Sequence, residues 1–152
     1  VTNAYFDKGN EIFKEDKNIA NLGPMFSKMT GVLVDAVAMR AWRFWASFLG
    51  FGYLQEMFII PNANVFLGDV ISSTNLEKKR MYSVDAIMPM ANIVISDIAA
   101  KKFNYGVSNG LRALQDAGKI KMEHIHDQED MWTLYPLKAY SNDSTITHIT
   151  II

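Results

Sequence analysis

The chain begins with short apolar clusters among charges and continues with a longer amphipathic stretch. Residues 1–30 predict helix in pieces. From about residue 25 or 31 to residue 49, apolar residues recur at spacings of three and four, which predicts one long helix. Its expected apolar face consists of Val34, Val37, Ala38, Ala41, Trp42, Trp45 and Leu49. Arg40 and Arg43 lie three residues apart on this helix and are expected to share an exposed face.

The region after this helix is predicted to form a hairpin and a polar connection. Glycines at 50 and 52 mark the end of the helix, since glycine is common just past a helix C-terminus. The apolar segments 53–60 and 65–71 flank a polar turn at 61–64, which predicts a β-hairpin. Residues 72–80 end in a Lys-Lys-Arg run and are predicted to be a linker or an exposed helix start. The stretch 84–100 is again apolar; its middle, residues 91–100, fits helix or strand, and the segment that follows favours helix.

Residues 95–137 contain the clearest succession of elements. A short helix is predicted near residues 95–99, with Ser96 as a candidate N-cap. A polar turn then leads to a second helix, 107–117, which Gly118 stops. The expected buried positions of this second helix are Val107, Leu111 and Leu114.

An acidic turn at 127–130 divides the next segment. Apolar residues alternate with polar ones on both sides of this turn, which predicts a β-hairpin with strands at 120–125 and 132–137. Two helices, a glycine and a hairpin in this order resemble the winged helix-turn-helix superfamily. The residues that carry the resemblance are Ile98, Ala99, Val107, Leu111, Arg112, Leu114, Ala117, Gly118 and Ile120.

The resemblance implies a role for each of these elements. Residues 107–117 would be the recognition helix, and the two strands would form the wing. The superfamily uses this fold both for DNA binding and for protein assembly, so the resemblance implies a fold and leaves the function open.

A similar order of helix, glycine and hairpin occurs upstream, over residues 32–71. We therefore predict an α+β, mainly helical protein of two tandem winged-helix units, residues 1–71 and 80–152. The segments AWRFWASFLGFGYL and FIIPNANVFL and the ending THITI are similar to tandem winged-helix proteins of bacterial antiviral and DNA-modification gene clusters, including those of 7-deazaguanine DNA modification. This second resemblance implies a non-catalytic accessory subunit that acts near DNA.

Composition narrows the class of protein. The 152 residues are 49% hydrophobic and 12% aromatic, which excludes an intrinsically disordered chain. The absence of cysteine excludes disulfide frameworks, cysteine-ligated metal sites and thiol nucleophiles. The most apolar run, 44–54, is too short to span a bilayer, so we expect no membrane segment and a cytoplasmic protein. Because the first residue is Val rather than Met, a longer parent chain is one expectation.

Charge is unevenly distributed although the formal net charge is only -1. Residues 101–121 hold five Lys or Arg against one Asp, a balance of +4, whereas residues 123–130 hold four Asp or Glu and no Lys or Arg, a balance of -4. The helix side of the unit is thus expected to attract phosphate, and the acidic wing tip to repel it. The candidate contacts with double-stranded DNA are Lys101, Lys102, Ser108, Asn109, Arg112, Lys119 and Lys121.

The upstream helix indicates a different function. Its aromatic residues Trp42, Trp45 and Phe48 are candidates for contact with a protein partner or a second copy of the chain, although packing in the core also accounts for such rings. DNA association and protein assembly thus stay open. No motif predicts an enzyme, a cofactor or a small-molecule substrate. His124 and His126 are better explained as the exposed face of a wing strand than as metal ligands.

Overall fold

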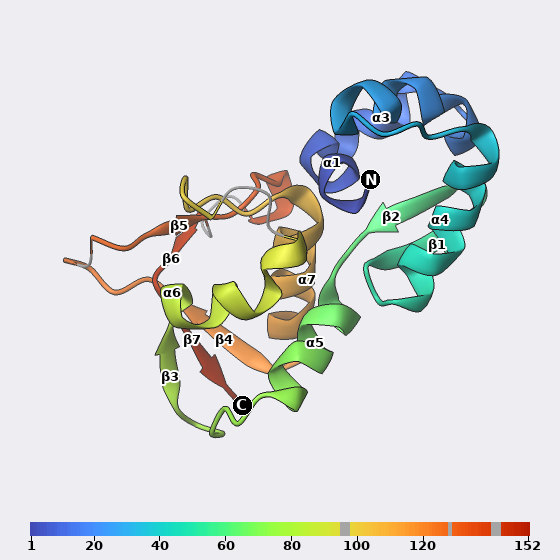
Figure 1. Ribbon diagram of the computed structural model, residues 1–152. Coiled ribbons are helices and arrows are strands. Elements are labelled where there is room, and N and C mark those ends of the chain that lie inside the picture. Colours follow the sequence, from blue (N-terminus) through green and yellow to red (C-terminus); the bar gives the residue numbers. More distant parts are fainter. Residues whose placement is uncertain (95–97, 128, 141–143) are drawn as a thin grey trace.

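Two lobes make up the computed structural model, which describes residues 1–94, 98–127, 129–140 and 144–152 (Figure 1). The N-terminal lobe consists of α1 (Thr2–Lys8), η1 (Gly9–Glu11), α2 (Ile12–Glu15), η2 (Ile19–Leu22), α3 (Gly23–Thr30), α4 (Ala36–Phe48), β1 (Gly52–Gln55) and β2 (Phe58–Pro61). The C-terminal lobe consists of α5 (Asn64–Ser73), β3 (Met81–Ser83), α6 (Val84–Ile87), η3 (Met88–Val94), α7 (Tyr105–Asp116), β4 (Ile120–Glu123), β5 (Trp132–Thr133), η4 (Lys138–Tyr140), β6 (Thr145–Ile146) and β7 (His148–Ile151). The chain is an α+β protein with small antiparallel sheets, as predicted. Among its described helices, none is both long and apolar enough to cross a bilayer.

Helix α7 agrees closely with the predicted helix 107–117. Asn104 caps it, because its side-chain oxygen accepts a hydrogen bond from the Val107 N–H at 3.0 Å. Gly118 follows the helix with a φ of +70°, a conformation that favours glycine. The predicted apolar positions are all buried, namely Val107, Leu111 and Leu114. This helix and its end are therefore confirmed.

The long helix expected to end at residue 49 is instead divided into α3 and α4. Gly31 ends α3 in a left-handed conformation with a φ of 71°. Four residues later, the Asp35 carboxylate accepts a hydrogen bond from the Ala38 N–H at 2.7 Å and caps α4. These ordinary stop and start signals override the apolar spacing that runs across them.

Helix α4 buries a different face from the one predicted. Its buried residues are Met39, Arg43 and Ala46, at spacings of four and three. Members of the predicted apolar face are exposed, including Val37 at 65%, Trp45 at 63% and Leu49 at 51%. The predicted face is thus wrong for most of its members, which lie at the surface, whereas Val34, just before α4, is buried and Trp42 is half-buried.

Arg43 lies on the buried face of α4 with Met39 and Ala46. It was expected at the surface beside Arg40, but it is only 9% exposed. Its Nη1 donates a hydrogen bond to the Glu56 carbonyl oxygen at 2.6 Å. Since Glu56 lies at the tip of the β1–β2 hairpin, the arginine joins α4 to that hairpin and brings the same face of the helix inward.

The β1–β2 hairpin is shorter than predicted. Gln55 pairs with Phe58, so Glu56 and Met57 form the turn, and the predicted turn at 61–64 leads into α5 instead. The segment 65–71, predicted as a strand, is therefore helical. A short apolar run fits a strand or a buried helix equally well. Here α5 packs against α7 and buries Leu67.

The predicted wing hairpin is also paired differently. β4 occupies its predicted place, but its antiparallel partner is β7, with Ile120 opposite Ile151 and Glu123 opposite His148. β3 pairs with the other edge of β7, which gives the order β3-β7-β4. β5 pairs with β6 in a separate small sheet. The direct pairing of 120–125 with 132–137 is thus wrong, because a strand at the end of the sequence lies beside β4.

Of the helix favoured for residues 91–100, residues 91–94 are helical as the end of η3, and α6 lies earlier in the same apolar stretch. η3 contains a kink at Ala91, with a φ of -113°. Ser96, the candidate N-cap, and Ile95 fall outside the described residues. Residues 98–100 form a turn.

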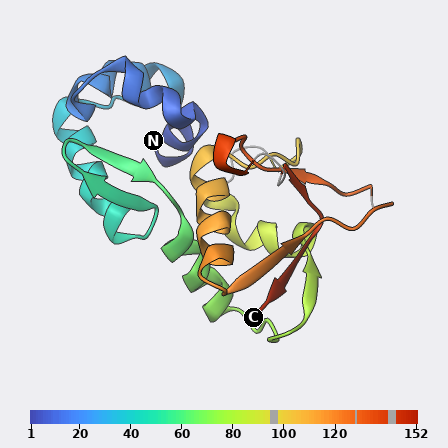
Figure 2. The same ribbon diagram turned by 180° about the vertical axis from the view of Figure 1, so that it is seen from behind.

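The two lobes share one apolar core, and α7 lies between the N-terminal helices and the β3-β7-β4 sheet (Figures 1 and 2). A Cβ on Gly106 would lie 2.4 Å from the ring of Phe6 in α1. A Cβ on Gly110 would lie 2.8 Å from the Ala63 carbonyl carbon. Only glycine permits approaches this close. The division into units 1–71 and 80–152 stays a prediction, and buried residues from both ranges contribute to the shared core.

Candidate functional site

The predicted recognition helix α7 is enclosed by other parts of the chain. Ser108 has no exposed surface, and its Oγ accepts a hydrogen bond from the Tyr135 N–H at 2.8 Å. Arg112 is 2% exposed, and its Nη1 donates to the Tyr135 carbonyl oxygen at 2.7 Å. Its guanidinium carbon also lies 5.0 Å from the centre of the Tyr140 ring. Both polar side chains therefore hold the segment around Tyr135 against the helix.

Asn109 has a similar structural role on the neighbouring side of α7. Its side-chain amide donates a hydrogen bond to the Pro61 carbonyl oxygen at 3.0 Å, which joins α7 to the end of β2. Together with the close approach of Phe6 to Gly106, these contacts cover the N-terminal half of the helix. Ser108, Asn109 and Arg112 each make an internal contact in this structure, and Ser108 and Arg112 are buried; their contact with DNA stays a prediction.

Lys101 belongs to a network of charges around the acidic turn. Its Nζ lies 2.6 Å from a carboxylate oxygen of Asp130 and 3.2 Å from one of Asp85. The hydrogen bond to Asp130 raises the pKa of Lys101, and the same bond lowers the pKa of Asp130. The indole N–H of Trp132 donates to the other Asp85 oxygen at 2.8 Å. Lys101, which was predicted to contact phosphate, therefore forms an ion pair with Asp130 of the acidic turn, which was expected to repel DNA.

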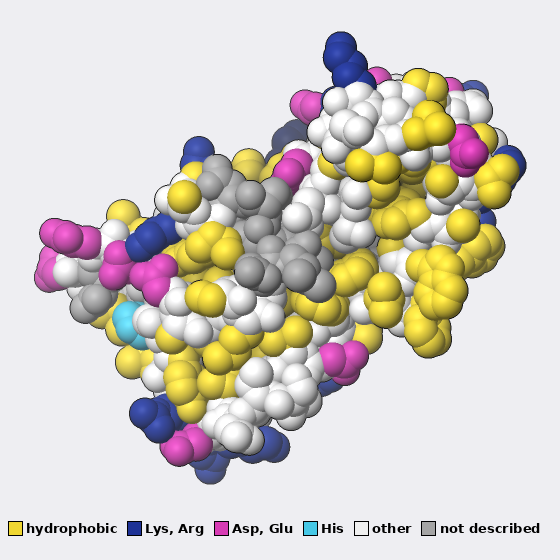
Figure 3. Space-filling view, viewed as in Figure 1, with side chains coloured by type: hydrophobic (Ala, Val, Ile, Leu, Met, Phe, Trp, Pro, Cys, Tyr) yellow, Lys and Arg dark blue, Asp and Glu magenta, His cyan; other side chains and the backbone are white. Residues whose placement is uncertain are grey.

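The remaining predicted cations lie at the surface, and two of them join a basic edge of the sheet. Lys102, Lys119 and Lys121 are exposed. The Ile152 N–H donates to the Lys119 carbonyl oxygen at 3.0 Å, and the Lys79 N–H donates to the Ile151 carbonyl oxygen at 2.6 Å. The two segments therefore flank the same end of β7. We call Lys78, Lys79, Arg80, Lys119 and Lys121 the basic edge; Figure 3 shows Lys and Arg side chains gathered at the lower end of the C-terminal lobe.

Two ion pairs reduce the positive charge of this edge. Lys121 lies 2.8 Å from a Glu123 oxygen, and Arg80 lies 3.2 Å from a Glu77 oxygen. The Lys-Lys-Arg run was visible in the sequence as part of a linker. Its position beside Lys119 was not, because β7 brings the two segments together from opposite ends of the C-terminal lobe.

The exposed side of α4 forms a large apolar surface. We call this surface the aromatic face; its residues are Val37, Phe44, Trp45, Phe48 and Leu49. Phe48 is 79% exposed, and its ring lies edge-to-face with that of Trp45 at 6.0 Å between centroids. Figure 3 shows hydrophobic side chains gathered on the α4–β1 side of the N-terminal lobe. Leu33, just before α4, adds a side chain that is 87% exposed.

Trp42 differs from the other two predicted interface residues. It is half-buried, and its ring centroid lies 4.9 Å from that of Tyr5. Its indole N–H donates to Thr2 Oγ1 at 3.0 Å. Trp42 therefore packs against α1, whereas Trp45 and Phe48 are available to a partner.

The described residues hold no group of three or more His, Asp or Glu side chains placed to bind a metal ion. His124 and His126 lie close together, with their ring centroids 5.2 Å apart in an edge-to-face arrangement. His124 Nδ1 lies 2.9 Å from Thr145 Oγ1, a hydrogen-bond distance. Both histidines are exposed, but they follow β4 rather than belonging to it, so the expected strand face is not where they lie.

Known proteins provide no template for either surface. No model of a protein family, no curated protein and no solved structure matches the chain. A functional proposal therefore depends on the geometry of the aromatic face and the basic edge.

Proposed function

We propose that the chain is an assembly module that associates through the aromatic face of α4. The observation that carries the proposal is the exposure of Trp45 and Phe48 on a helix whose opposite face is packed into the core. Covering apolar surface contributes about 25 cal/mol per Å². Monomeric proteins rarely expose a contiguous apolar surface of this kind, and aromatic residues are enriched in protein interfaces.

The proposed partner is a second copy of the chain. A two-fold dimer would place the aromatic face of one copy against the same face of the other, so that both exposed surfaces are covered at once. The formal net charge of -1 gives little electrostatic repulsion between copies. A helix of 13 residues presents this face on a regular element, which suits packing of helix against helix.

We also propose that the C-terminal lobe is a winged helix, and the order of its elements supports this proposal. Residues 84–94 are helical, α7 follows a turn, and β4 and β7 pair after Gly118 with a long connection between them. Under this interpretation the β5–β6 pair would belong to an extended wing. The burial of the helix that would read DNA favours the use of this fold for assembly.

Light scattering coupled to size-exclusion chromatography tests the proposal. We expect the wild-type chain to have the mass of a dimer and the Trp45→Ala/Phe48→Ala variant to have the mass of a monomer. The matched control is Met81→Ala/Met131→Ala, which removes two apolar side chains that are 47% and 45% exposed elsewhere on the surface. A wild-type chain that stays monomeric at all accessible concentrations, or a double variant that stays dimeric, would contradict the proposal.

DNA association is the second candidate function, and the basic edge is the observation that favours it. Its five cations come from two segments that flank β7, and phosphate contacts by exposed Lys and Arg supply most non-specific affinity for DNA. A role as an accessory subunit of a bacterial antiviral or DNA-modification system would follow from this candidate and from the resemblance in the sequence.

A fluorescence-polarisation titration with duplex DNA at two salt concentrations tests this candidate. Lys119→Gln/Lys121→Gln should weaken binding and reduce its dependence on salt. Ser108→Ala, inside the molecule, should leave the affinity of the folded protein unchanged. Absence of salt-dependent binding by the wild-type chain would remove DNA association as a function of this edge.

A further inference from the structure

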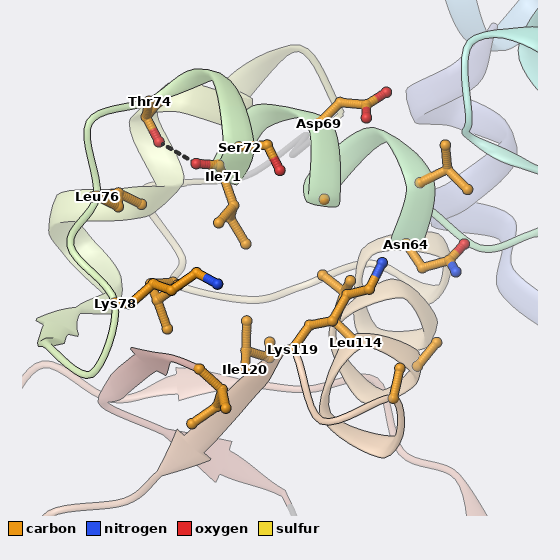
Figure 4. Close-up of a pocket in the computed structure, with 16 residues that line it drawn as sticks. Asn64, Asp69, Ile71, Ser72, Thr74, Leu76, Lys78, Leu114, Lys119 and Ile120 are labelled. Carbon is orange, nitrogen blue, oxygen red and sulfur yellow. Dashed lines mark hydrogen bonds between the residues drawn. The ribbon is translucent and has the colours of Figure 1, made fainter.

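A cavity of about 640 Å³ lies in the C-terminal lobe, away from the aromatic face (Figure 4). It is bounded by α5 and the segment after it, by the end of α7 and the start of β4, and by the end of β7. Its size is within the range of about 300–1,000 Å³ that is usual for small-molecule sites. The sequence pattern did not indicate this cavity, because α5, which forms one of its walls, was predicted to be a strand.

The floor of the cavity is apolar. Leu114, Ile120 and Ile151 line it, and each is at most 6% exposed. Ile71 and Leu76 add apolar surface on the opposite wall, as Figure 4 shows. Gly68 of α5 also lines the cavity, where a larger residue would reduce the available space. An apolar molecule of moderate size would therefore gain contacts on several sides.

Two lysines stand at the rim on opposite sides of this floor. Lys78 comes from the segment between α5 and β3, and Lys119 from the turn between α7 and β4. Within the part of the chain that the structure describes, neither ammonium group has a carboxylate oxygen within 4.0 Å. Asp69 is the one acidic side chain among the lining residues, and in Figure 4 its carboxylate points away from the cavity.

We infer that this cavity binds a small organic anion with an apolar body, such as a medium-chain carboxylate. The apolar part would lie on the floor, and the carboxylate would accept hydrogen bonds from Lys78 and Lys119, which the cavity places on either side of its opening. The inference does not depend on the proposed assembly function, since neither lysine belongs to the aromatic face.

Titration of the full chain with sodium octanoate, followed by two-dimensional ¹H–¹⁵N NMR, tests the inference. Saturable shifts are expected at the amides of Gly68, Lys119 and Ile120. 1-Octanol has the same apolar chain without the charge and should bind more weakly. Octanoate that produces no saturable shift at these amides, or that binds no more tightly than 1-octanol, overturns the inference.

Two pairs of lysine variants separate the cavity from the basic edge as a whole. Lys78→Gln/Lys119→Gln removes both rim charges and should weaken octanoate binding roughly tenfold. Lys79→Gln/Lys121→Gln removes two neighbouring charges that do not line the cavity and should change the affinity by no more than about twofold. Equal weakening by the two pairs would show a general anion-binding edge and would overturn the cavity site.

A variant that fills the cavity gives a readout independent of charge. Gly68→Leu should abolish the octanoate shifts, whereas Gly68→Ala should retain them, because a Cβ at this position would lie 3.7 Å from Leu114 Cδ2, an ordinary contact. Thermal unfolding of both variants confirms that each is folded before titration. Undiminished octanoate binding by folded Gly68→Leu would contradict the inferred site.

Discussion

Helices α4 and α7 have similar lengths and opposite environments. α4 has 13 residues, and one whole side of it is exposed and aromatic. α7 has 12 residues, and α1, β2, α5 and β4 all contact it. The helix with the more apolar sequence thus has one side at the surface, and the helix that contains two glycines lies in the core, although serine and arginine occur in both. Position in the fold, rather than the share of apolar residues in a helix, decides which helix is covered.

Both helices bury an arginine in the same manner. Arg43 of α4 donates from Nη1 to the Glu56 carbonyl oxygen, and Arg112 of α7 donates from Nη1 to the Tyr135 carbonyl oxygen. In each case a cation that sequence alone would place in water binds the backbone of a later segment. Arg43 thereby joins α4 to a hairpin, and Arg112 joins α7 to the segment around Tyr135. What remains open is the far side of α4.

The largest expected difference in the free energy of unfolding is between the variants of two phenylalanines, one packed against α7 and one exposed on α4. Phe6 is fully buried against α7, so Phe6→Ala should reduce the free energy of unfolding by about 3–5 kcal/mol. Phe48 on the aromatic face is exposed, so Phe48→Ala should change it by less than about 0.5 kcal/mol. Urea denaturation at low protein concentration measures both. Similar losses for the two variants would show that α4 is covered within the monomer.

The buried arginines are the next largest expected effect. Arg43→Ala and Arg112→Ala each remove a part-buried hydrogen bond from a charged donor to a backbone carbonyl, which should cost about 2–3 kcal/mol of folding free energy. Arg40→Ala, on the exposed side of α4, is the matched control and should cost less than about 0.5 kcal/mol. The same denaturation experiment compares the three. A loss for Arg40→Ala as large as that for Arg43→Ala would contradict the orientation of α4.

Ser108 should have a smaller effect of the same kind. Ser108→Ala removes the acceptor of the Tyr135 N–H, so the free energy of unfolding should fall by about 1–2 kcal/mol. Hydrogen exchange of the Tyr135 amide should become faster in this variant. An unchanged exchange rate would show that this amide does not depend on α7 for protection.

The pH dependence of the Lys101 network should be the smallest effect, because its groups are largely solvated. The pKa of Asp130 is lowered in the folded state, so its contribution to stability is present above the ordinary carboxyl pKa of about 4 and is lost as pH falls through the lowered value. The pKa of Lys101 is raised, so its contribution is present below about pH 10.4 and is lost as pH rises through the raised value. Asp130→Asn should reduce the change of the urea midpoint in acid. A variant with the same acid profile as the wild type would show that the pair has no effect on folding.

Local signals predicted much of the fold. The Asn104 cap, the apolar spacing and Gly118 specify α7 without help from the rest of the chain. Local signals could not predict that β4 pairs with β7, because a long connection separates the two strands in the sequence. The α5 segment was ambiguous because a short apolar run fits either strand or helix.

The candidate site was predictable only in part, for a related reason. Trp45 and Phe48, which the sequence singled out as candidates for a partner contact, are exposed, although packing in the core also accounted for such rings; their contact with a partner stays a prediction. Ser108 and Arg112 were interpreted as surface groups because a polar side chain on a helix usually faces water. The segment around Tyr135 covers them. Local sequence patterns could not predict this contact, because more than twenty residues separate its partners.

The central claim is that the aromatic face of α4 is the surface through which the chain associates. ¹⁹F NMR of the chain labelled with 5-fluorotryptophan tests it directly, because the three tryptophans differ in burial and each can be assigned by substitution with Phe. With rising protein concentration, the Trp45 resonance should shift in parallel with the increase in mass, while that of buried Trp132 should stay unchanged. A Trp45 resonance that stays constant while the chain dimerises, or a chain that never dimerises, would contradict the claim.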